Sequence, residues 1–270
     1  MARVIWEVDF YSRPVVDDQG KKLWELILCD PQGQDCIAQV CPPDQVNSQW
    51  LYSALEPWVK EHKITHLRSF RLPMLPMLTR ACEGLRVTVL PSRRVVALAY
   101  WLGQRWRTQY SQMPGFQPLA APPPLRVPAA PQPLPAALRG QQWAWSQLLW
   151  GQIRSEGAEW ADFGELLPLQ YINLPDERPI PGLIVYSSRA AALAAWMSGL
   201  ELAAIETEGE QIILATGIEE RWLFSRTGKG MGDFPTAQAQ AQGVHFLAVQ
   251  SSPQAATLAG FWLMQTLALE

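Results

Sequence analysis

Apolar and polar residues alternate along the first part of the chain in the manner of β-strands. The alternating runs are Val4–Tyr11 and Leu23–Cys29, and the turn-forming residues Asp17–Gly20 separate them. A third run, Cys36–Val40, follows a turn at Pro31–Gly33. A side-chain period of two indicates half-buried strands, and short Asp/Gly turns join antiparallel neighbours, so the pattern predicts a three-stranded meander.

The period then becomes helical. Leu51 and Leu55 lie on one helix face, and Asn47 or Ser48 can cap a helix that runs to about Glu61. The elements expected next are a strand at Ile64–Phe70, a helix at Pro73–Glu83, a strand at Arg86–Leu90 and a helix from Ser92 to about Arg107. The order β-β-β-α-β-α-β-α is that of the ribonuclease-H-like fold, an inference that rests on element order alone.

The second half shows related pieces. Trp143–Trp150 forms a strand or a packed connector. Strands are expected at Leu183–Tyr186, Leu202–Glu206, Gln211–Ala215, Arg221–Ser225 and Val244–Gln250, and helices at Ala190–Gly199, Pro235–Gln242 and Pro253–Leu267. The segment Val87–Gly103 also lines up with Leu183–Gly199 as strand, Ser-Arg turn and helix. Domain duplication explains this echo, and so does chance similarity between common units.

A proline-rich segment separates the halves. Proline fixes φ and has no N–H donor, so the stretch between Pro114 and Pro135 is expected to run extended over the surface. The predicted organisation is an N-terminal α/β domain at 1–110, a linker at 111–140 and a C-terminal α/β domain at 141–270. Both domains are expected to contain mixed sheets, and each is a candidate for the ribonuclease-H-like fold.

Charge is distributed unevenly. The net charge is −3, which taken globally argues against a nucleic-acid ligand. Residues 61–110, however, hold nine Lys or Arg and two Asp or Glu, so nine minus two gives a local charge of +7. Either this block contacts phosphates, with Arg68, Arg71, Arg93 and Arg94 as candidates, or it is a solvated face that balances an acidic second half.

Two Ser-Arg turns precede predicted helices. They are Ser92-Arg93-Arg94 and Ser187-Ser188-Arg189. The free N–H groups and the dipole of a helix N-terminus attract anions, so Arg93, Arg94 and Arg189 are candidate phosphate contacts. The alternative is simple capping of the helix by serine, which needs no ligand.

The ribonuclease-H-like order calls for a test of nuclease chemistry, which needs carboxylates that converge on divalent cations. Asp9 and Glu56 stand at suitable places, but Arg68 occupies the strand where a further acid is needed. We therefore expect no catalytic and no metal-binding residues, and Asp9 is expected to pair with a nearby arginine. The Gly228–Gly232 stretch lacks phosphate-loop spacing and is expected to be a loop, and no cofactor is expected.

The four cysteines and the hydropathy point to a cytosolic protein. Cys29, Cys36, Cys41 and Cys82 form no Cys-x-x-Cys motif and are expected to be reduced. The first residues resemble no secretion signal, and no apolar run is long enough to span a membrane, so no membrane insertion is expected.

Taken together, many short segments resemble the Tab family of chloroplast and cyanobacterial translation factors for photosystem I. The resemblance rests on Trp6–Phe10, Ser12–Pro14, Gly20–Leu26, Arg68–Arg71, Pro91–Arg94, Pro114–Gln117, Pro181–Leu183, Ser188–Arg189, Leu193–Met197, Gly199–Glu201, His245–Gln250 and Gly260–Leu263. It covers essentially the whole chain.

The resemblance implies an RNA-binding, non-catalytic factor that promotes synthesis of photosystem I reaction-centre subunits. Its implied partners are the untranslated region of a photosystem mRNA and proteins of translation or photosystem assembly. A Trp-Leu-Leu tripeptide of the family matches Trp262, Leu263 and Met264, of which Met264 departs from the pattern. Periodicity instead assigns these three residues to the core.

The plant members carry a transit peptide and this chain begins at the shared domain, so a cyanobacterial, cytoplasmic protein is expected. A metal-dependent nuclease and an assembly scaffold are the rival functions.

Overall fold

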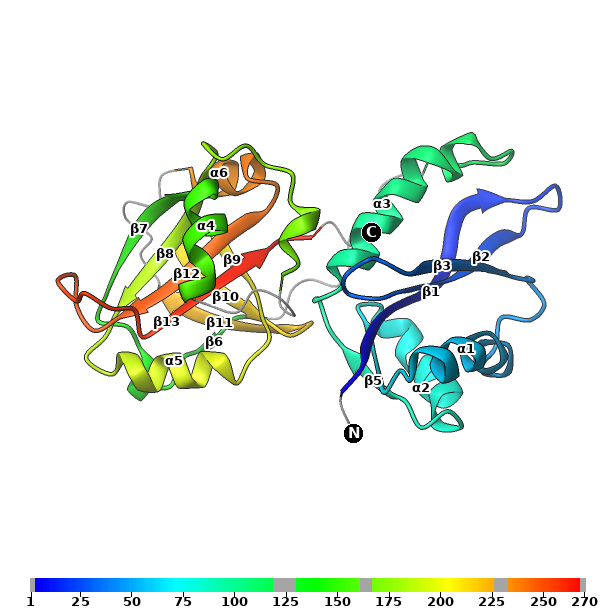
Figure 1. Cartoon of the computed structure of the whole chain (residues 1–270), viewed down its shortest axis with the longest axis horizontal. Coiled ribbons are helices and arrows are strands. Elements are labelled where there is room, and N and C mark those ends of the chain that lie inside the picture. Colours follow the sequence, from blue (N-terminus) through cyan, green and yellow to red (C-terminus); the bar gives the residue numbers. More distant parts are fainter. Residues whose placement is uncertain (1–2, 119–129, 161–166, 226–232, 268–270) are drawn as a thin grey trace. The chain divides into compact units, whose positions relative to one another are not determined.

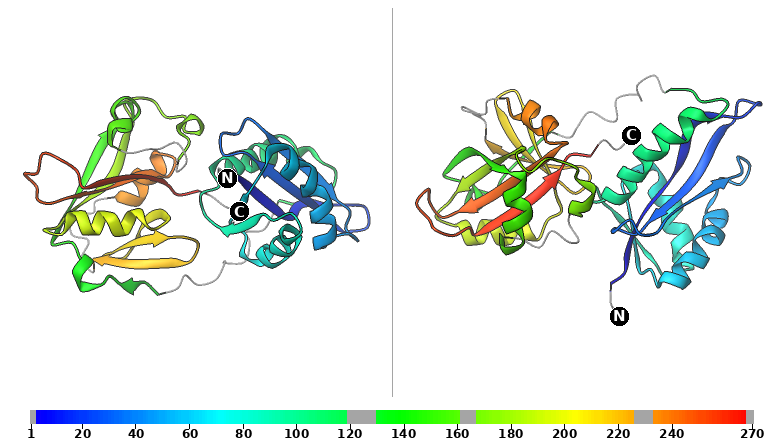
Figure 2. Two further views of the ribbon diagram at one scale, coloured as in Figure 1. Left: turned by 60° about the horizontal axis from the view of Figure 1, so that its bottom comes forward. Right: turned by 45° about the horizontal axis from the view of Figure 1, so that its top comes forward.

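The chain folds into two compact units. The computed structural model describes residues 3–118, 130–160, 167–225 and 233–267. The N-terminal unit lies within Met1–Arg126, and the C-terminal unit is Val127–Leu267. Both combine helices with mixed sheets, which confirms the predicted α/β class (Figures 1 and 2). Among the described helices, none has the length and apolar character needed to cross a bilayer.

The N-terminal unit contains the expected elements. Its strands are β1 Ile5–Val16, β2 Lys22–Cys29, β3 Cys36–Cys41, β4 His66–Ser69 and β5 Thr88–Pro91. Its helices are α1 Ser48–His62, α2 Leu75–Glu83 and α3 Val96–Thr108, with short 3₁₀ turns at Leu72–Met74 and Tyr110–Gln112. The Asn47 side chain accepts a hydrogen bond from the Trp50 N–H at 2.9 Å, so the predicted cap of α1 is confirmed.

One five-stranded sheet organises this unit. Its order is β3-β2-β1-β4-β5, in which β1–β3 are antiparallel and β4 and β5 run parallel to β1. This is the strand arrangement of the ribonuclease-H-like fold predicted from element order. The helices α1 and α2 cover one face of the sheet and α3 covers the other (Figure 1).

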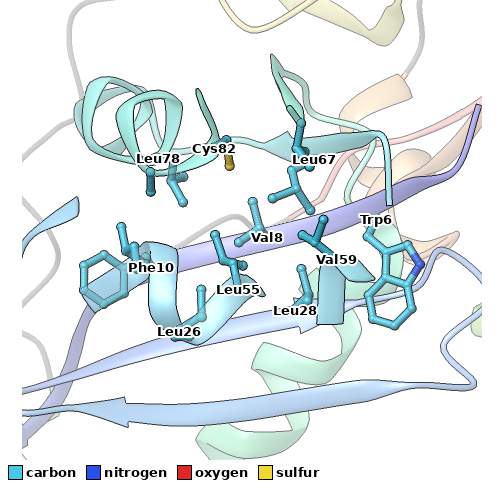
Figure 3. Packing of buried hydrophobic residues seen from close by; sticks show 14 of the residues in the cluster. Trp6, Val8, Phe10, Leu26, Leu28, Leu55, Val59, Leu67, Leu78 and Cys82 are labelled. Carbon is cyan, nitrogen blue, oxygen red and sulfur yellow. The ribbon is translucent and has the colours of Figure 1, made fainter. Parts of the chain in front are cut away.

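The two faces of β1 differ in chemistry. Trp6, Val8 and Phe10 point toward α1 and α2, where they pack with Leu55 and Leu78 in an apolar core (Figure 3). Burying each such side chain contributes roughly 1.5–3 kcal/mol to stability. The intervening residues of β1 include two carboxylates, so the face beneath α3 is polar.

The C-terminal unit is built from shorter elements. Its strands are β6 Gln132–Pro133, β7 Gln142–Leu149, β8 Pro179–Tyr186, β9 Leu202–Glu208, β10 Gln211–Thr216, β11 Glu220–Ser225, β12 Val244–Gln250 and β13 Gly260–Gln265. Its helices are α4 Trp150–Trp160, α5 Ala190–Ser198 and α6 Phe234–Gln240, with 3₁₀ turns at Ala136–Leu138 and Leu169–Tyr171. The sequence did not predict α4 or β6.

The strands of this unit form two sheets and not one. Their orders are β13-β12-β8-β7 and β6-β11-β10-β9. The ribonuclease-H-like arrangement predicted for the second half is therefore wrong, because the meander β9–β11 pairs with β6 and leaves the parallel strands β8 and β12 in the other sheet. Side chains from β8, β9, β10, β12, β13 and α5 share one hydrophobic core.

The predicted helix Pro253–Leu267 is also wrong. Turns occupy the first part of this segment, and Gly260–Gln265 is the strand β13, paired antiparallel with β12. Both faces of β13 are covered, so its apolar residues are continuous and do not alternate. A short continuous apolar run has no period that separates a strand from a buried helix.

The described ends of the proline-rich segment belong to the units. Gly115 has φ +77°, and its carbonyl accepts a hydrogen bond from the Val16 N–H at 3.0 Å, while Phe116 bridges to Val15. At the other end, Leu134 is buried in the C-terminal unit. Residues 119–129 lie outside the described residues, and the predicted boundaries at 110 and 140 stay a prediction.

Candidate nucleic-acid interface

Three arginines gather at one edge of the N-terminal sheet, where two neighbouring strands end. β4 and β5 are parallel and in register, with Ser69 opposite Pro91. Arg71 follows β4, and Arg93 and Arg94 follow β5. Because the carboxyl ends of parallel strands meet at the same edge, the backbone brings these three residues together although they are distant in sequence.

Ser92 shapes the loop that carries two of them. Its N–H donates to the Ser69 carbonyl at 3.0 Å, and its Oγ accepts from the Arg94 N–H at 3.0 Å. Ser92 is buried, whereas Arg93 and Arg94 are half-buried. The hydroxyl therefore organises the turn before α3 and does not cap the helix, which begins at Val96 without a side-chain cap from the preceding residue.

The Glu7 carboxyl group occupies the N-terminus of α3. Glu7 Oε2 accepts a hydrogen bond from the Leu98 N–H at 2.8 Å, and the Ala97 N–H is bonded to the same side chain. Burial raises the pKa of Glu7 to about 8, against the lowering effect of these N–H groups and of Arg68. Glu7 thus occupies the N–H groups at the start of α3, which the sequence offered as a site for an anion. A phosphate bound in this region would therefore contact guanidinium groups instead of the helix N-terminus.

Arg68 lies inside the unit. It stands opposite Glu7 on β1 and Leu90 on β5, beneath α3, and is 6% exposed. The predicted RNA contact would need a surface side chain. The buried position instead gives Arg68 an electrostatic role beside Glu7.

Asp9 holds Arg71 in place. Arg71 Nε donates to Asp9 Oδ1 at 2.7 Å, and Arg13 Nη1 donates to Asp9 Oδ2 at 2.7 Å. The Arg71 guanidinium also lies 4.2 Å from the centre of the Tyr11 ring and 4.7 Å from that of Phe70. The prediction that Asp9 pairs with an arginine is confirmed, and Arg71 is oriented by a carboxylate and two rings.

A second carboxylate extends this network beneath α3. Glu25 Oε2 accepts a hydrogen bond from Arg13 Nε at 3.3 Å. Arg105 on α3 and the Tyr110 hydroxyl also donate to Glu25. Burial, opposed by Arg13 and aided by Glu25, raises the pKa of Tyr110 to about 12. Within the basic block, Arg105 and Arg68 are therefore held by contacts inside the N-terminal unit.

The structure does not assemble a nuclease site from the two acids that the sequence considered. Both oxygens of Asp9 accept hydrogen bonds from arginines on the face beneath α3. Glu56 lies on α1, which covers the other face, and bonds Tyr52 at 3.1 Å and Lys60 at 2.9 Å. Within the described residues, no group of three or more His, Cys, Asp or Glu side chains could hold a metal ion. The Gly228–Gly232 stretch lies outside those residues.

The second Ser-Arg turn repeats the local geometry of the first. Ser187 is buried, its N–H donates to the Gln250 carbonyl at 3.0 Å, and its Oγ accepts from the Arg189 N–H at 3.1 Å. Ser187 therefore corresponds to Ser92 in structure. The sequence alignment of the two segments is shifted by one residue relative to this correspondence. Arg189 is exposed at the start of α5.

The C-terminal tripeptide lies on β13. Leu263 is 6% and Met264 is 3% exposed, and Trp262 is half-buried against the core that contains Met264. A Cβ added at Gly260 would come within 2.3 Å of the Trp262 indole, so the ring lies directly over this glycine. The periodicity argument for the core matches this placement of Leu263 and Met264. Trp262 alone of the three keeps appreciable surface.

A buried histidine ties the two C-terminal sheets together. His245 on β12 accepts a hydrogen bond at Nε2 from the Ile205 N–H on β9 at 2.9 Å, and its Nδ1 lies 2.8 Å from the Gly243 carbonyl. Burial lowers the pKa of His245 to about 4. The ring is therefore neutral, with its proton on Nδ1.

Sequence reasoning missed the acidic half of the N-terminal network. Glu7 and Glu25 sit inside strands that are otherwise apolar, and Glu7 and Asp9 share one face of β1 by their spacing of two. Once a helix is expected to cover that face, such carboxylates require buried partners. This signal was present in the sequence.

Family comparison matches both units. Residues 5–105 match the N-terminal domain and residues 122–265 the C-terminal domain of a family described as RNA-binding protein Tab2/Atab2. The catalytic core domain of BIV integrase is similar to 33% of this chain, over 53% of its own, at 16% identity and a TM-score of 0.25, values too low to support an argument.

Two plant proteins align over nearly the whole chain. The protein named "Protein TAB2 homolog, chloroplastic" from Arabidopsis thaliana is 34% identical over 275 residues, which cover 96% of this chain and 74% of the relative. The protein of the same name from Zea mays is 38% identical over 277 residues, 96% of this chain and 70% of the relative. This chain belongs to the Tab2/Atab2 family.

Proposed function

We propose that this chain is an RNA-binding factor without catalytic activity. The observation that carries the proposal is the convergence of Arg71, Arg93 and Arg94 at the edge where β4 and β5 end. Guanidinium groups bind phosphate oxygens through charge-assisted hydrogen bonds. The description of the family as RNA-binding identifies the polyanion as RNA.

Each predicted contact has a distinct part in this proposal. Arg71 is oriented by Asp9, and Arg93 and Arg94 lie half-buried in the turn that Ser92 organises. Tyr100 on α3 is 46% exposed and offers a ring on which an unpaired base stacks. On the C-terminal unit, Arg189 supplies a further exposed guanidinium.

The tripeptide acts on RNA mainly through the fold. Leu263 and Met264 are buried on β13, so they shape the C-terminal unit, and only Trp262 has surface for a direct contact. Arg68 likewise acts from inside the N-terminal unit, beside Glu7.

The finer function follows from the Tab resemblance. The RNA is the untranslated region of an mRNA for a photosystem I reaction-centre subunit, and binding promotes its translation, with translation or assembly proteins as further partners. The location is cytoplasmic, whereas the two plant relatives are named chloroplastic. Crosslinking in the native host followed by sequencing of the bound RNA tests the target, and cell fractionation tests the location. Enrichment of unrelated transcripts would reject the photosystem assignment.

The salt dependence of RNA affinity tests the interface. We expect Arg93→Ala with Arg94→Ala to weaken binding of a labelled single-stranded RNA. The slope of log affinity against log salt should become shallower by about 0.7 for each phosphate that the protein ceases to neutralise. The matched control is Arg80→Ala with Arg86→Ala, which removes two exposed arginines of the same basic block elsewhere on the unit. Equal effects of both pairs would show that the block acts only through its overall charge.

Two assays separate the rival functions. Incubation of the protein with RNA and with DNA in Mg²⁺ or Mn²⁺ should give no cleavage. Cleavage that Asp9→Asn abolishes would establish a nuclease. For the scaffold alternative, protein partners that copurify after ribonuclease treatment, from a protein that shows no RNA affinity, would replace the RNA-binding proposal.

A further inference from the structure

Two cysteines face each other across the β2–β3 hairpin. Cys29 ends β2, Cys36 begins β3, and their Cα atoms are register partners in the antiparallel pair. Register partners project to the same face of a sheet. Both thiols therefore lie on the side that also carries Glu7, the partner of Cys29 on β1.

The hydrogen bonds of the hairpin show whether Cys29 and Cys36 are a hydrogen-bonded or a non-hydrogen-bonded pair. The Asp30 N–H donates to the Asp35 carbonyl at 2.9 Å, so Asp30 and Asp35 are the hydrogen-bonded pair that closes the hairpin. Hydrogen-bonded and non-hydrogen-bonded pairs alternate along antiparallel strands, which makes Cys29 and Cys36 a non-hydrogen-bonded pair. Such pairs have Cα atoms about 4.5 Å apart, within the range of about 4.4–6.8 Å that a disulfide bridges.

Cys36 also affects the ionisation of Cys29. A hydrogen bond to Cys36 is the largest cause that raises the pKa of Cys29, followed by burial. Cys29 is buried and Cys36 is half-exposed. A reagent in solution thus reaches Cys36 first, with Cys29 placed behind it to resolve the product.

The other two cysteines lack this arrangement. Cys41 stands opposite Trp24 in the same hairpin, and Cys82 is buried in the core between α2 and the sheet. Each is a free thiol, and neither has a cysteine as its register partner in the described sheets. They are internal controls for the pair.

We propose that Cys29 and Cys36 form a reversible dithiol–disulfide site whose co-reactant is a small-molecule disulfide such as oxidised glutathione. The Cys36 thiolate attacks one glutathione sulfur and releases one reduced glutathione, which leaves a mixed disulfide on Cys36. The Cys29 thiolate then attacks the Cys36 sulfur and releases the second glutathione. Two protein thiols and one glutathione disulfide become one protein disulfide and two glutathione thiols, so atoms and electrons balance.

The bridge would join the edge strand β3 covalently to β2. The same row of side chains continues through Glu7 to Arg68, so the sulfur pair borders the residues that hold the start of α3. The chemistry itself does not depend on RNA binding. A protein that binds no RNA can still show the disulfide, and failure of one proposal leaves the other standing.

Thiol counting on the purified full-length chain tests the proposal. After treatment with oxidised glutathione, denaturation and alkylation, we expect the alkylated thiols to fall from four to two and the intact mass to fall by two hydrogen atoms. Peptide mapping should identify the Cys29–Cys36 bridge, and dithiothreitol should restore all four thiols.

Single variants decide between this bridge and other products. Cys36→Ala alters a half-exposed residue and should abolish the bridge, whereas Cys82→Ala should retain it. Cys29→Ser should stop the reaction at a glutathione adduct on Cys36. A stable adduct on Cys36 in the unmodified sequence, a Cys36-linked dimer, a bridge that uses Cys41, or four thiols that remain alkylatable would each overturn the proposal.

Discussion

Two buried regions of the molecule are stabilised by different interactions. One is the polar face under α3 in the N-terminal unit, and the other is the sheet around β13 in the C-terminal unit. The first encloses the carboxyl groups of Glu7, Asp9 and Glu25 together with guanidinium groups. The second is covered on both faces mainly by apolar side chains and contains the neutral ring of His245. Buried ions require every partner, whereas an apolar sheet requires shape and volume.

This difference bears on where function resides. The ionic network orients Arg71 at the sheet edge where Arg93 and Arg94 also lie. The buried charges therefore fix the position of one residue of the candidate interface. The apolar strand β13 holds most of the family tripeptide inside the fold. Changes in the N-terminal network should therefore alter ligand binding and stability together, and changes in β13 should act on binding through stability.

The largest effect is expected at the centre of the ionic network. Arg13→Ala removes the guanidinium that joins the buried Asp9 and Glu25, and each acid keeps only its other partners, so we expect a loss of about 3–5 kcal/mol in the free energy of unfolding. The control is Arg154→Ala, which breaks an exposed pair with Asp176 and should cost about 0–1 kcal/mol. Denaturant unfolding of both variants measures the contrast, and similar losses would show that the network adds no stability of its own.

The next effect sharpens the comparison at β13. Met264→Ala opens a cavity in the C-terminal core and should cost about 2–5 kcal/mol. Gly260→Ala should displace the Trp262 indole, because the new Cβ would lie 2.3 Å from it, and it leaves the indole itself present. Melting temperature and RNA affinity are measured on the same preparations.

These two variants, together with Trp262→Ala, separate a folding role from a direct contact. If the tripeptide acts through the fold, RNA affinity should decline only in proportion to the unfolded fraction. Trp262→Ala with near-native melting and abolished affinity would instead establish Trp262 as an RNA contact.

Much of the N-terminal unit could be predicted from the sequence, and the reason is local. Alternation marks β1 and β2 because one face is apolar, and Asn47 marks the start of α1 by its side-chain chemistry. β13 could not be predicted, because burial on both faces removes the period. The partners of Glu7 could not be assigned either, since the Leu98 N–H is 91 residues away and only tertiary packing brings it there.

The candidate site followed the same division. The Ser92 turn could be inferred from residue type, and the pairing of Asp9 with arginine followed from the need to neutralise a buried acid. That Arg68 and Arg105 would point into the unit did not follow, because a net charge count does not say which side of a sheet or helix each side chain takes.

A smaller effect contrasts the two units by pH. The folded state raises the pKa of Glu7 to about 8 from an ordinary value of 4.5, so the folded state binds the extra proton between these values. The contribution of protonated Glu7 to the free energy of unfolding is complete below about pH 4.5 and is lost as the pH rises through 8. Between about pH 6 and pH 8 we expect a loss of about 2–3 kcal/mol.

The variant Glu7→Gln isolates this contribution. It keeps a neutral acceptor for the Leu98 N–H and has no proton to lose, so its stability should lack the decline. Denaturant unfolding across that pH range measures the difference from the unmodified chain, and parallel curves would refute the assignment to Glu7.

The smallest effect has the opposite sign and lies in the C-terminal unit. Burial lowers the pKa of His245 to about 4 from 6.5, so the unfolded state binds the extra proton between these values. Stability from the neutral ring is present above about pH 6.5 and is lost as the pH falls toward 4, by about 1–2 kcal/mol between about pH 6 and pH 5.

Protonation of Nε2 also removes the acceptor of the Ile205 N–H. Hydrogen exchange of the Ile205 amide, corrected for its intrinsic pH dependence, should therefore accelerate as the pH falls. The variant His245→Gln cannot titrate and should show a protection independent of pH over this range. Protection of Ile205 that stays constant in the unmodified chain would mean that His245 does not link the two C-terminal sheets through a neutral ring.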